Sequence, residues 1–336
     1  MNLDKKSLPA YLRRKKLLGP GQSLKVVECL SSGPKNLVYY VATAEDRWIV
    51  KQALSRVQQV KERWWIDRKR IFHEKSCLEV LAQILPPDIL PTVVLEDRTD
   101  FVLVTNPPPR DALSWDVELR GGRIDLQLAV QCGELLAEVH NETFDVRELK
   151  SLFRDTKPFE QLRLEPLYTG LIQTYPDLKK LLEHQTRQLL KSHFALVLGD
   201  IRPRNVWIAS GQIFLVDFAM AHFGNPSFDL AFFASDMCLK AMQNSPQKAA
   251  YLEAINIFWS SYFRIAEYPK KADVEKSAVR DFGCLLLGAI DGRLPVDFMD
   301  EPTRQLARRI AHNLLFTELE RIEDITEFIN RTLIDG

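Results

Sequence analysis

The sequence predicts an α+β protein of two unequal lobes, a small β-rich lobe followed by a larger, mostly α-helical lobe. Residues 24–52 contain short runs rich in Val, Tyr, Ile and Leu separated by polar turns, which is typical of strands. The run Asn106-Pro-Pro-Pro109 is a rigid connector, and beyond it the apolar residues recur mostly at helical spacing. We therefore expect an N-terminal lobe at residues 1–105 and a C-terminal lobe at residues 106–336.

The first lobe is expected to hold a sheet and one helix. The helix is predicted over residues 68–84, because Ile71, Leu78 and Leu81 recur at helical spacing. Two consecutive prolines at positions 86 and 87 stop this pattern. Strands are predicted at 24–30, 37–43, 47–52, 91–96 and 101–105.

The second lobe is expected to be helical around a short β-hairpin. In the hairpin, Ser210-Gly211 reverses the chain between the strand that follows Asn205 and the strand at 213–217. Helices are predicted at 125–140, 177–192, 228–243, 248–266, 273–290, 299–316 and 318–333.

Composition excludes several classes of protein. Of the 336 residues, 46% are apolar and 27% are charged, which is ordinary for a globular protein. Lys and Arg together number 45, as do Asp and Glu, and this zero net charge argues against a general nucleic-acid role. The longest apolar run, Phe282–Ile290, is too short for a membrane span. We expect neither a nucleic-acid nor a membrane partner, and the oligomeric state stays open.

The cysteines and the N-terminus bear on the compartment. Five cysteines are scattered without any C-x-x-C pair, so a disulfide or zinc framework is not expected. The basic N-terminal residues are not followed by an apolar core, unlike those of a signal peptide. A reducing cytoplasm fits both observations.

Polar side chains follow two neighbouring strands in the second lobe. Asp200 and Asn205 lie in a loop after the apolar run that begins at Leu196, and Asp217 ends the second strand of the hairpin. In phosphoryl transfer, an aspartate receives the hydroxyl proton, while an Asn and a second Asp hold Mg²⁺ on the phosphates. The spacing from Asp200 to Asn205 equals that of the D-x-x-x-x-N catalytic loop of protein kinases.

A plain turn is the alternative interpretation of this loop, since Asp and Asn are common turn residues and Gly199 and Pro203 lie among them. Asp217 shifts the balance, because the hairpin brings it back beside Asn205. We therefore interpret Asp200 as the catalytic residue and Asn205 and Asp217 as metal ligands, with ATP and Mg²⁺ as cofactors.

Candidate nucleotide-binding residues lie in the first lobe. Lys51 ends the third predicted strand and resembles the V-A-I-K lysine that holds the α- and β-phosphates; the alternative is a solvated edge lysine. Its partner carboxylate is expected on the following helix, at Glu74 or, as the alternative, at Glu79. Gly33 and Asn36 lie where a phosphate-covering loop would be, although one glycine is also compatible with a simple hairpin turn.

Two arginines and a D-F-G sequence are further candidates. Arg163 and Arg293 are candidates for clamping an acceptor or its anionic group, against the alternative that both are exposed loop arginines. Asp281-Phe-Gly283 spells a kinase metal motif, but it lies in a helical stretch far beyond the catalytic loop. We expect Asp281 to be a surface residue of a helix.

At these residues the chain resembles the aminoglycoside phosphotransferase and choline kinase-like superfamily, which has a protein-kinase-like bilobal fold. The hallmark H-G-D-x-x-x-x-N corresponds to Leu198–Asn205 and is followed by Val216-Asp-Phe218. The segment Gly224–Ala231 is similar to G-x-P-x-x-D-L-A, and the resemblance implies that Asp229 braces the catalytic loop. Within the superfamily, Asn36–Tyr39, Ile49–Leu54 and the Arg- and Trp-rich insert before Glu74 look most like the methylthioribose kinase branch.

The resemblance implies an ATP-dependent phosphotransferase that moves the γ-phosphoryl group to a hydroxyl of a small metabolite, sugar or aminoglycoside-like acceptor. One departure concerns Leu198, which replaces the family histidine that supports the loop. It leaves a second hypothesis, a weak or inactive pseudokinase that acts as a nucleotide-binding module. A protein kinase proper ranks last, because no A-P-E element follows Asp217.

Overall fold

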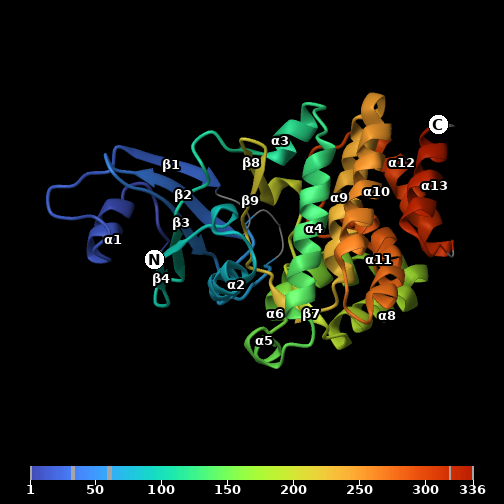
Figure 1. Cartoon of the computed structure of the whole chain (residues 1–336), viewed down its shortest axis with the longest axis horizontal. Coiled ribbons are helices and arrows are strands. Elements are labelled where there is room, and N and C mark those ends of the chain that lie inside the picture. Colours follow the sequence, from blue (N-terminus) through green and yellow to red (C-terminus); the bar gives the residue numbers. More distant parts are fainter. Residues whose placement is uncertain (1, 32–34, 59–62, 318, 335–336) are drawn as a thin grey trace.

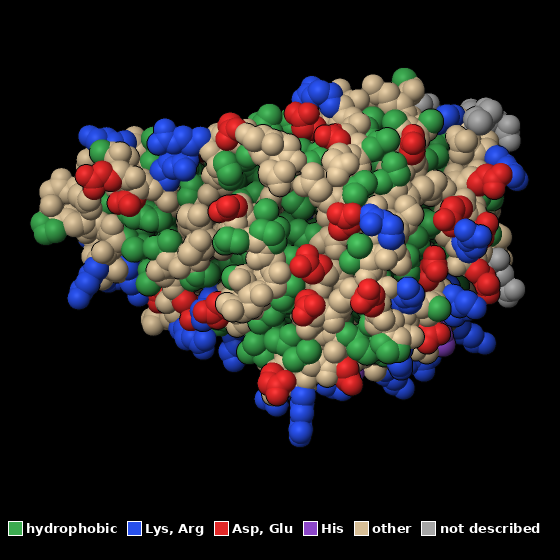
Figure 2. Space-filling model, viewed as in Figure 1, with side chains coloured by type: hydrophobic (Ala, Val, Ile, Leu, Met, Phe, Trp, Pro, Cys, Tyr) green, Lys and Arg blue, Asp and Glu red, His purple; other side chains and the backbone are tan. Residues whose placement is uncertain are grey.

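Two lobes of different secondary structure make up the fold, which confirms the predicted fold class (Figure 1). The computed structural model describes residues 2–31, 35–58, 63–317 and 319–334. In Figure 1 the sheet of the first lobe lies at one end of the molecule and the long helices lie at the other. Charged side chains of both signs are scattered over the visible face of both lobes (Figure 2).

The N-terminal lobe is built on a five-stranded antiparallel sheet with the order β1-β2-β3-β5-β4. Its strands are β1 (Val26–Ser31), β2 (Asn36–Ala42), β3 (Arg47–Ala53), β4 (Val93–Asp97) and β5 (Val102–Thr105). Helix α2 (Arg70–Ile84) packs on β3, β4 and β5, and a 3₁₀ turn, η1 (Pro87–Ile89), follows it. The last strand of the sheet ends at Thr105, directly before the proline connector.

A first helix, α1 (Leu8–Arg14), was not predicted from the sequence. It buries Leu8, Tyr11 and Leu12 in the same apolar cluster as Val50 and Val104 of the sheet. The Tyr11 hydroxyl donates a hydrogen bond to Asp97 Oδ2 at 2.9 Å. Helix α1 has few apolar residues among basic ones, too few to show helical periodicity in the sequence. Packing against the sheet stabilises it.

The C-terminal lobe is mainly helical, as predicted. Its strands are short: β6 (Leu113–Ser114) pairs with β8 (Val206–Ala209) and β8 with β9 (Gln212–Leu215), while β7 (Ala195–Val197) pairs with β10 (His222–Gly224). The longer helices are α4 (Leu126–Thr143), α8 (Lys179–Lys191), α9 (Ser227–Gln243), α10 (Lys248–Ile265), α11 (Lys271–Asp291), α12 (Glu301–Phe316) and α13 (Ile322–Ile334). The shorter ones include α3 (Trp115–Arg120), α5 (Arg147–Leu152), α6 (Lys157–Phe159) and α7 (Glu165–Leu167).

Helix α9 lies at the centre of the C-terminal lobe. It packs against α10 and α11, and nearly all of its side chains are buried. A helix surrounded in this way must be largely apolar, and most residues of Phe228–Met242 are. Its buried charged side chains have partners: Asp236 pairs with Lys240, and Asp229 accepts backbone hydrogen bonds. Because α9 is fixed so firmly, a side chain at its N-terminal end can hold a neighbouring loop in place.

The expectation that Asp281 is a surface residue was wrong. Its side chain lies in the core beside α9, with only 1% of the residue exposed. The Tyr168 hydroxyl (3.2 Å) and the Ser227 hydroxyl (3.1 Å) donate hydrogen bonds to its carboxyl group. Burial raises the pKa of Asp281 to about 7. Helical spacing alone did not show that α11 is covered on the face that carries this residue.

Two further findings bear on earlier expectations. Among the described residues, no helix is both long enough and apolar enough to cross the bilayer. The five cysteines, all within the described ranges, are free thiols, and four of them are buried.

Candidate active site

Lys51 is held between the two lobes by two carboxylates. Strand β3 carries it in register with β2 and β5, where it lies opposite Val38 and Leu103. Its Nζ is 2.6 Å from Glu74 Oε2 on α2 and 2.6 Å from Asp217 Oδ1 in the C-terminal lobe. The alternative partner, Glu79, pairs instead with Lys75 on the outer side of α2.

The two carboxylates keep Lys51 charged although it is buried. Burial by itself lowers the pKa of Lys51, but Asp217 and Glu74 outweigh it and raise that pKa. Burial opposes ionisation of Asp217 as well, yet Lys51 and Lys35 hold its pKa well below the usual range. The ammonium group and the Asp217 carboxylate are therefore both charged at neutral pH.

The loop between β7 and β8 is fixed through its backbone. Asp229, fully buried near the start of α9, accepts hydrogen bonds from the amides of Leu198 (2.7 Å) and Gly199 (2.8 Å). Gly199 has a φ of +73°, and a Cβ there would meet Met220 O at 2.7 Å, so only glycine fits. Because Asp229 holds main-chain amides, the loop is braced without a histidine side chain at Leu198.

A histidine from helix α4 lies near Asp229. His140 of α4 places Nε2 at 3.5 Å from Asp229 Oδ2, and its Nδ1 is 2.8 Å from the Tyr262 hydroxyl.

At the end of the loop, the short 3₁₀ turn η5 (Pro203–Asn205) positions Asn205, whose Nδ2 donates to Asp200 O at 2.8 Å. The Asn205 side-chain oxygen is left for another ligand.

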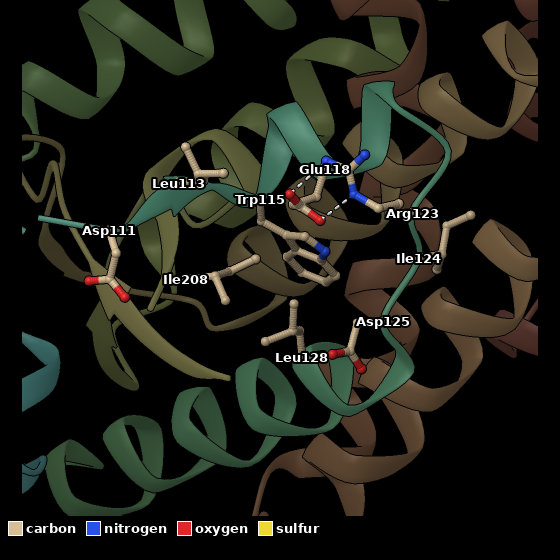
Figure 3. A pocket seen from close by; sticks show the side chains of 9 residues that line it. All are labelled: Asp111, Leu113, Trp115, Glu118, Arg123, Ile124, Asp125, Leu128 and Ile208. Carbon is tan, nitrogen blue, oxygen red and sulfur yellow. Dashed lines mark hydrogen bonds and ion pairs between the residues drawn. The ribbon is translucent and has the colours of Figure 1, made fainter. Parts of the chain in front are cut away.

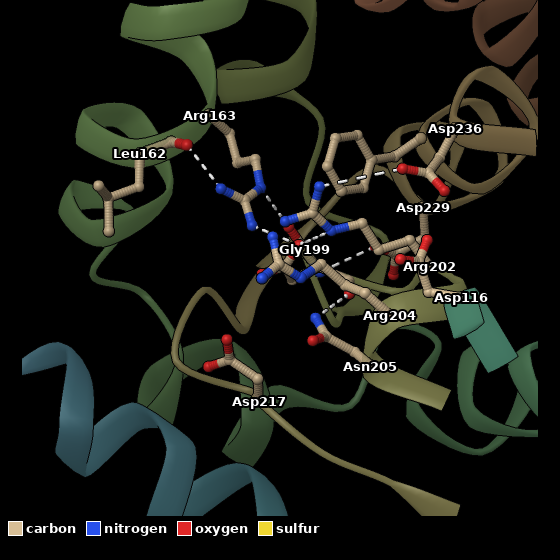
Figure 4. A network of polar contacts seen from close by, with 12 residues as sticks. Asp116, Leu162, Arg163, Gly199, Arg202, Arg204, Asn205, Asp217, Asp229 and Asp236 are labelled. Atoms are coloured by element: carbon tan, nitrogen blue, oxygen red, sulfur yellow. Dashed lines mark hydrogen bonds and ion pairs between the residues drawn. The ribbon is translucent and has the colours of Figure 1, made fainter. Parts of the chain in front are cut away.

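Asp200 is enclosed by cations. Its Oδ1 is 2.6 Å from Arg163 Nη2 and 3.0 Å from Arg202 Nε, and its Oδ2 is 3.9 Å from Lys35 Nζ (Figure 4 shows both arginines). The side chain is only 1% exposed. Burial raises the pKa of Asp200, but Arg163, Arg202 and Lys35 outweigh burial and lower it. The carboxylate is therefore ionised and oriented.

Arg163 is buried, unlike the exposed loop arginine that was the alternative interpretation. It comes from a π-helical turn, η2 (Glu160–Leu164), in a run of short helical turns that the sequence did not indicate. Its Nε donates to Gly199 O at 2.8 Å and its Nη1 to Leu162 O at 2.6 Å. Arg163 thus fixes both the loop backbone and Asp200.

Arg293, the other candidate for substrate binding, lies elsewhere. Its guanidinium is 4.4 Å from the centroid of the Trp64 ring and forms an ion pair with Glu165. Trp64 belongs to the insert before α2, which packs against Leu162 and Met220 of the C-terminal lobe. The structure therefore associates Arg293 with this insert, whereas Arg163 contacts Asp200.

Of the loop predicted to cover the phosphates, only Lys35 and Asn36 next to β2 are described together with Ser31. Gly33 lies outside the described residues. The Asn36 side-chain oxygen accepts a hydrogen bond from Arg70 Nη2 at 3.0 Å, so it is engaged in holding the start of β2 to α2. The neighbouring Lys35 places its Nζ 3.9 Å from Asp200 Oδ2. Sequence reasoning missed Lys35 and Arg202; their positive charges were visible, but not the direction in which they point.

A separate pocket of about 420 Å³ lies in the C-terminal lobe (Figure 3). Its lining includes Trp115, Ile208 and the ion pair of Glu118 with Arg123, at 2.7 Å. None of the predicted site residues lines it. It is therefore distinct from the site around Lys51 and Asp200.

A β-rich lobe over a helical lobe, with the Lys51 triad beside an Asp-x₄-Asn loop, defines a phosphotransferase of the protein-kinase-like class. The sequence model of the phosphotransferase enzyme family matches residues 26–268, and the chain belongs to this family. It is a phosphotransferase with an alcohol group as acceptor.

Curated relatives include two bacterial methylthioribose kinases. The one from Pectobacterium atrosepticum is 26% identical, over 81% of this chain and 77% of the relative. The one from Exiguobacterium sibiricum is 24% identical, over 90% of this chain and 84% of the relative. The alignments thus extend over both lobes.

Solved structures share the fold at low sequence identity. An amicoumacin kinase in complex with AMP-PNP, Ca²⁺ and its ligand superimposes with a TM-score of 0.57 at 13% identity, covering 96% of this chain and 100% of that one. A choline/ethanolamine kinase family protein from Mesorhizobium loti gives a TM-score of 0.52 at 15% identity, covering 98% and 100%. These likenesses establish the architecture alone.

Proposed function

We propose that the chain transfers the γ-phosphoryl group of ATP to a hydroxyl group of a small molecule. The observation that carries this proposal is the double ion pair of Lys51 with Glu74 and Asp217, next to the braced loop that presents Asp200. A lysine fixed by a helix carboxylate is the arrangement that positions the α- and β-phosphates in kinases.

The oxygen donors of the site suit a magnesium ion. Asn205 offers its side-chain oxygen, because its Nδ2 is occupied by Asp200 O, and Asp217 is 23% exposed with one oxygen on Lys51. Among the described residues, no group of three or more His, Cys, Asp or Glu is arranged to hold a metal. Mg²⁺ commonly takes one or two protein oxygens and completes its shell with phosphate and water. When bound, it would neutralise charge on the phosphates.

Each remaining residue has a role that follows from its contacts. Asp200, ionised and held by Arg163, orients the acceptor hydroxyl and receives its proton. Lys35 lies over Asp200 from the N-terminal lobe, where it can neutralise the transferring phosphoryl group. Asp229 keeps the loop in place. Positioning and charge neutralisation, without a covalent intermediate, supply the rate.

The relatives support this proposal by their names: methylthioribose kinases act on a small molecule, and the amicoumacin kinase was solved with the ATP analogue AMP-PNP. We infer ATP as the donor on this basis. The free cysteines and the need for ATP favour the cytoplasm. Nothing in the described site favours the inactive pseudokinase, since the lysine, both aspartates and the asparagine are all present.

A test compares ADP formation by the purified chain with that of its Asp200→Ala and Asp217→Ala variants, across a panel of hydroxyl compounds. Both variants are expected to lose turnover while keeping their far-UV circular dichroism. Asp297→Ala, which changes an exposed aspartate, is the matched control. Unchanged ADP formation in the Asp200 variant would contradict the proposal, and tight ATP binding without transfer to any acceptor would favour the pseudokinase.

A further inference from the structure

A basic cluster lies around Asp200 in the C-terminal lobe. We define it as Arg163, Arg202, Arg204 and Lys240. Two of these residues belong to the catalytic loop itself, one to the π-helical turn η2 and one to α9. In Figure 4, Arg163, Arg202 and Arg204 all extend into the region in front of the loop that carries Gly199 and Asn205.

Two of the four cations pack on one aromatic ring. The guanidinium carbons of Arg163 and Arg202 lie 5.1 Å and 5.3 Å from the centroid of Phe232 on α9. Arg202 contacts a second carboxylate besides Asp200, because its Nη1 is 4.0 Å from Asp236 Oδ1. Packing on the ring orients two planar guanidinium groups with little freedom, which is how forked recognition of an anion is prepared.

Carboxylates do not balance the cluster. Lys240 pairs with Asp236 and, at 3.0 Å, with Asp116. The four cations therefore face three carboxylates, those of Asp116, Asp200 and Asp236. The excess is one positive charge.

Arg204 carries much of this excess. It is exposed, and its guanidinium forms no ion pair with any residue in the described ranges. It lies in the turn η5 next to Asn205, and the Ser114 hydroxyl donates to its backbone oxygen at 3.2 Å, which fixes the backbone from which it extends. Arg202 also stays accessible, because its side chain is 20% exposed although it contacts both Asp200 and Asp236.

Neutralising Asp200 does not require this many cations. Arg163 alone gives Asp200 a short ion pair and is itself buried. A second guanidinium on the same carboxylate oxygen adds desolvation, and a third, exposed and unpaired in the same loop, adds repulsion, which a neutral acceptor would not offset. A cationic acceptor would be repelled. An anionic group on the acceptor would offset the excess charge.

We propose that the acceptor is an anionic hydroxy compound, one that carries a carboxylate or a phosphate monoester near the hydroxyl that is phosphorylated. The proposal rests on the kinase function proposed above. Arg204 and the open side of Arg202 bind the anion by charge-assisted hydrogen bonds, while Arg163 holds Asp200.

The chemical step balances without any further reactant. The acceptor oxygen forms a bond to the γ-phosphorus of ATP as the bond from that phosphorus to the β,γ-bridging oxygen breaks. ADP leaves with the electron pair of the broken bond. The hydroxyl proton passes to the Asp200 carboxylate and then to solvent.

The test uses pairs of acceptors that differ only in the anionic group: glycerate and glycerol, gluconate and glucose, ribose 5-phosphate and ribose. Phosphorylated product is detected by mass spectrometry and ADP release by a coupled assay, both at constant ionic strength. We expect kcat/KM at least roughly tenfold higher for the anionic member of a pair. The carboxylate pairs and the phosphate pair separate the two sources of negative charge.

Arg204→Gln is expected to raise KM for the anionic acceptor roughly tenfold with a smaller effect on kcat, because one charge-assisted contact is lost. Its matched control is Arg147→Gln, which changes an exposed arginine of α5 without an effect on KM. Equal or greater turnover of the neutral members, or an equal KM change in both variants, overturns the proposal.

The two proposals fail in distinguishable ways. If no anionic compound of the panel is phosphorylated or competes with phosphoryl transfer, the anionic acceptor is overturned. ATP hydrolysis with water as acceptor, present in the wild type and lost in Asp217→Ala, would then still uphold the kinase function. Absence of both ATP binding and hydrolysis in the wild type would overturn the kinase function itself.

Discussion

The nucleotide side and the acceptor side of the site hold their aspartates differently. Asp217 pairs with the single cation Lys51 at 2.6 Å, and 23% of its side chain is exposed. Asp200 has two arginines on one oxygen, and only 1% of its side chain is exposed. An aspartate that is to receive a metal must stay open, whereas one that orients a hydroxyl gains from being locked in place. Substitutions should therefore separate the two sides.

The largest expected effect is on turnover, at Asp217. Replacing it with Ala removes a proposed metal ligand and a partner of Lys51, and should lower kcat roughly a thousandfold, about 4 kcal/mol. Stability should change little, because Glu74 still pairs with Lys51. Steady-state kinetics and thermal unfolding check both parts. A large loss of stability in Asp217→Ala would contradict the expected difference between Asp217 and Asp200.

The next effect is on stability, at Asp200. Asp200→Asn leaves the buried Arg163 without its counter-charge and should lower the free energy of unfolding by about 3 kcal/mol. Urea denaturation of this variant beside Asp217→Asn measures the difference. If both variants unfold at the same midpoint, the two aspartates are held alike and the comparison is wrong.

A smaller loss is expected at Asp229, which braces the acceptor side. Asp229→Asn keeps one acceptor oxygen but turns an amide group towards a backbone N–H of Leu198 or Gly199. The free energy of unfolding should fall by about 2 kcal/mol. Hydrogen exchange of the Leu198 and Gly199 amides should quicken in this variant. Unchanged protection would show that the loop does not depend on the brace.

The smallest effect concerns pH and Lys35. Burial, with Arg163, lowers the pKa of Lys35 to about 7. The ammonium form, which attracts phosphate, is therefore present below pH 7 and is lost as pH rises through that value. We expect kcat/KM for ATP to fall as pH rises through about 7, by roughly tenfold. Lys35→Gln should remove this limb of the profile. If Lys35→Gln still shows the fall of kcat/KM near pH 7, another group causes it.

The sequence by itself determined the local spacing of the proposed site residues. The spacing of Asp200 and Asn205 and the turn before Asp217 fix their distances along the chain, and the period of β3 places Lys51 near the sheet end. Such local patterns can be recognised in the sequence because strands and tight turns have few geometries. The two-lobe architecture followed from the same patterns.

Only the tertiary structure decided the acceptor side. Arg163 reaches Asp200 across 37 positions, from a π-helical turn without a clear period, and α11 turns Asp281 into the core. Such contacts depend on how helices pack, and the direction of a long, flexible side chain is fixed by its neighbours in space. The sequence shows the charge of an arginine, but the fold determines which carboxylate that arginine contacts.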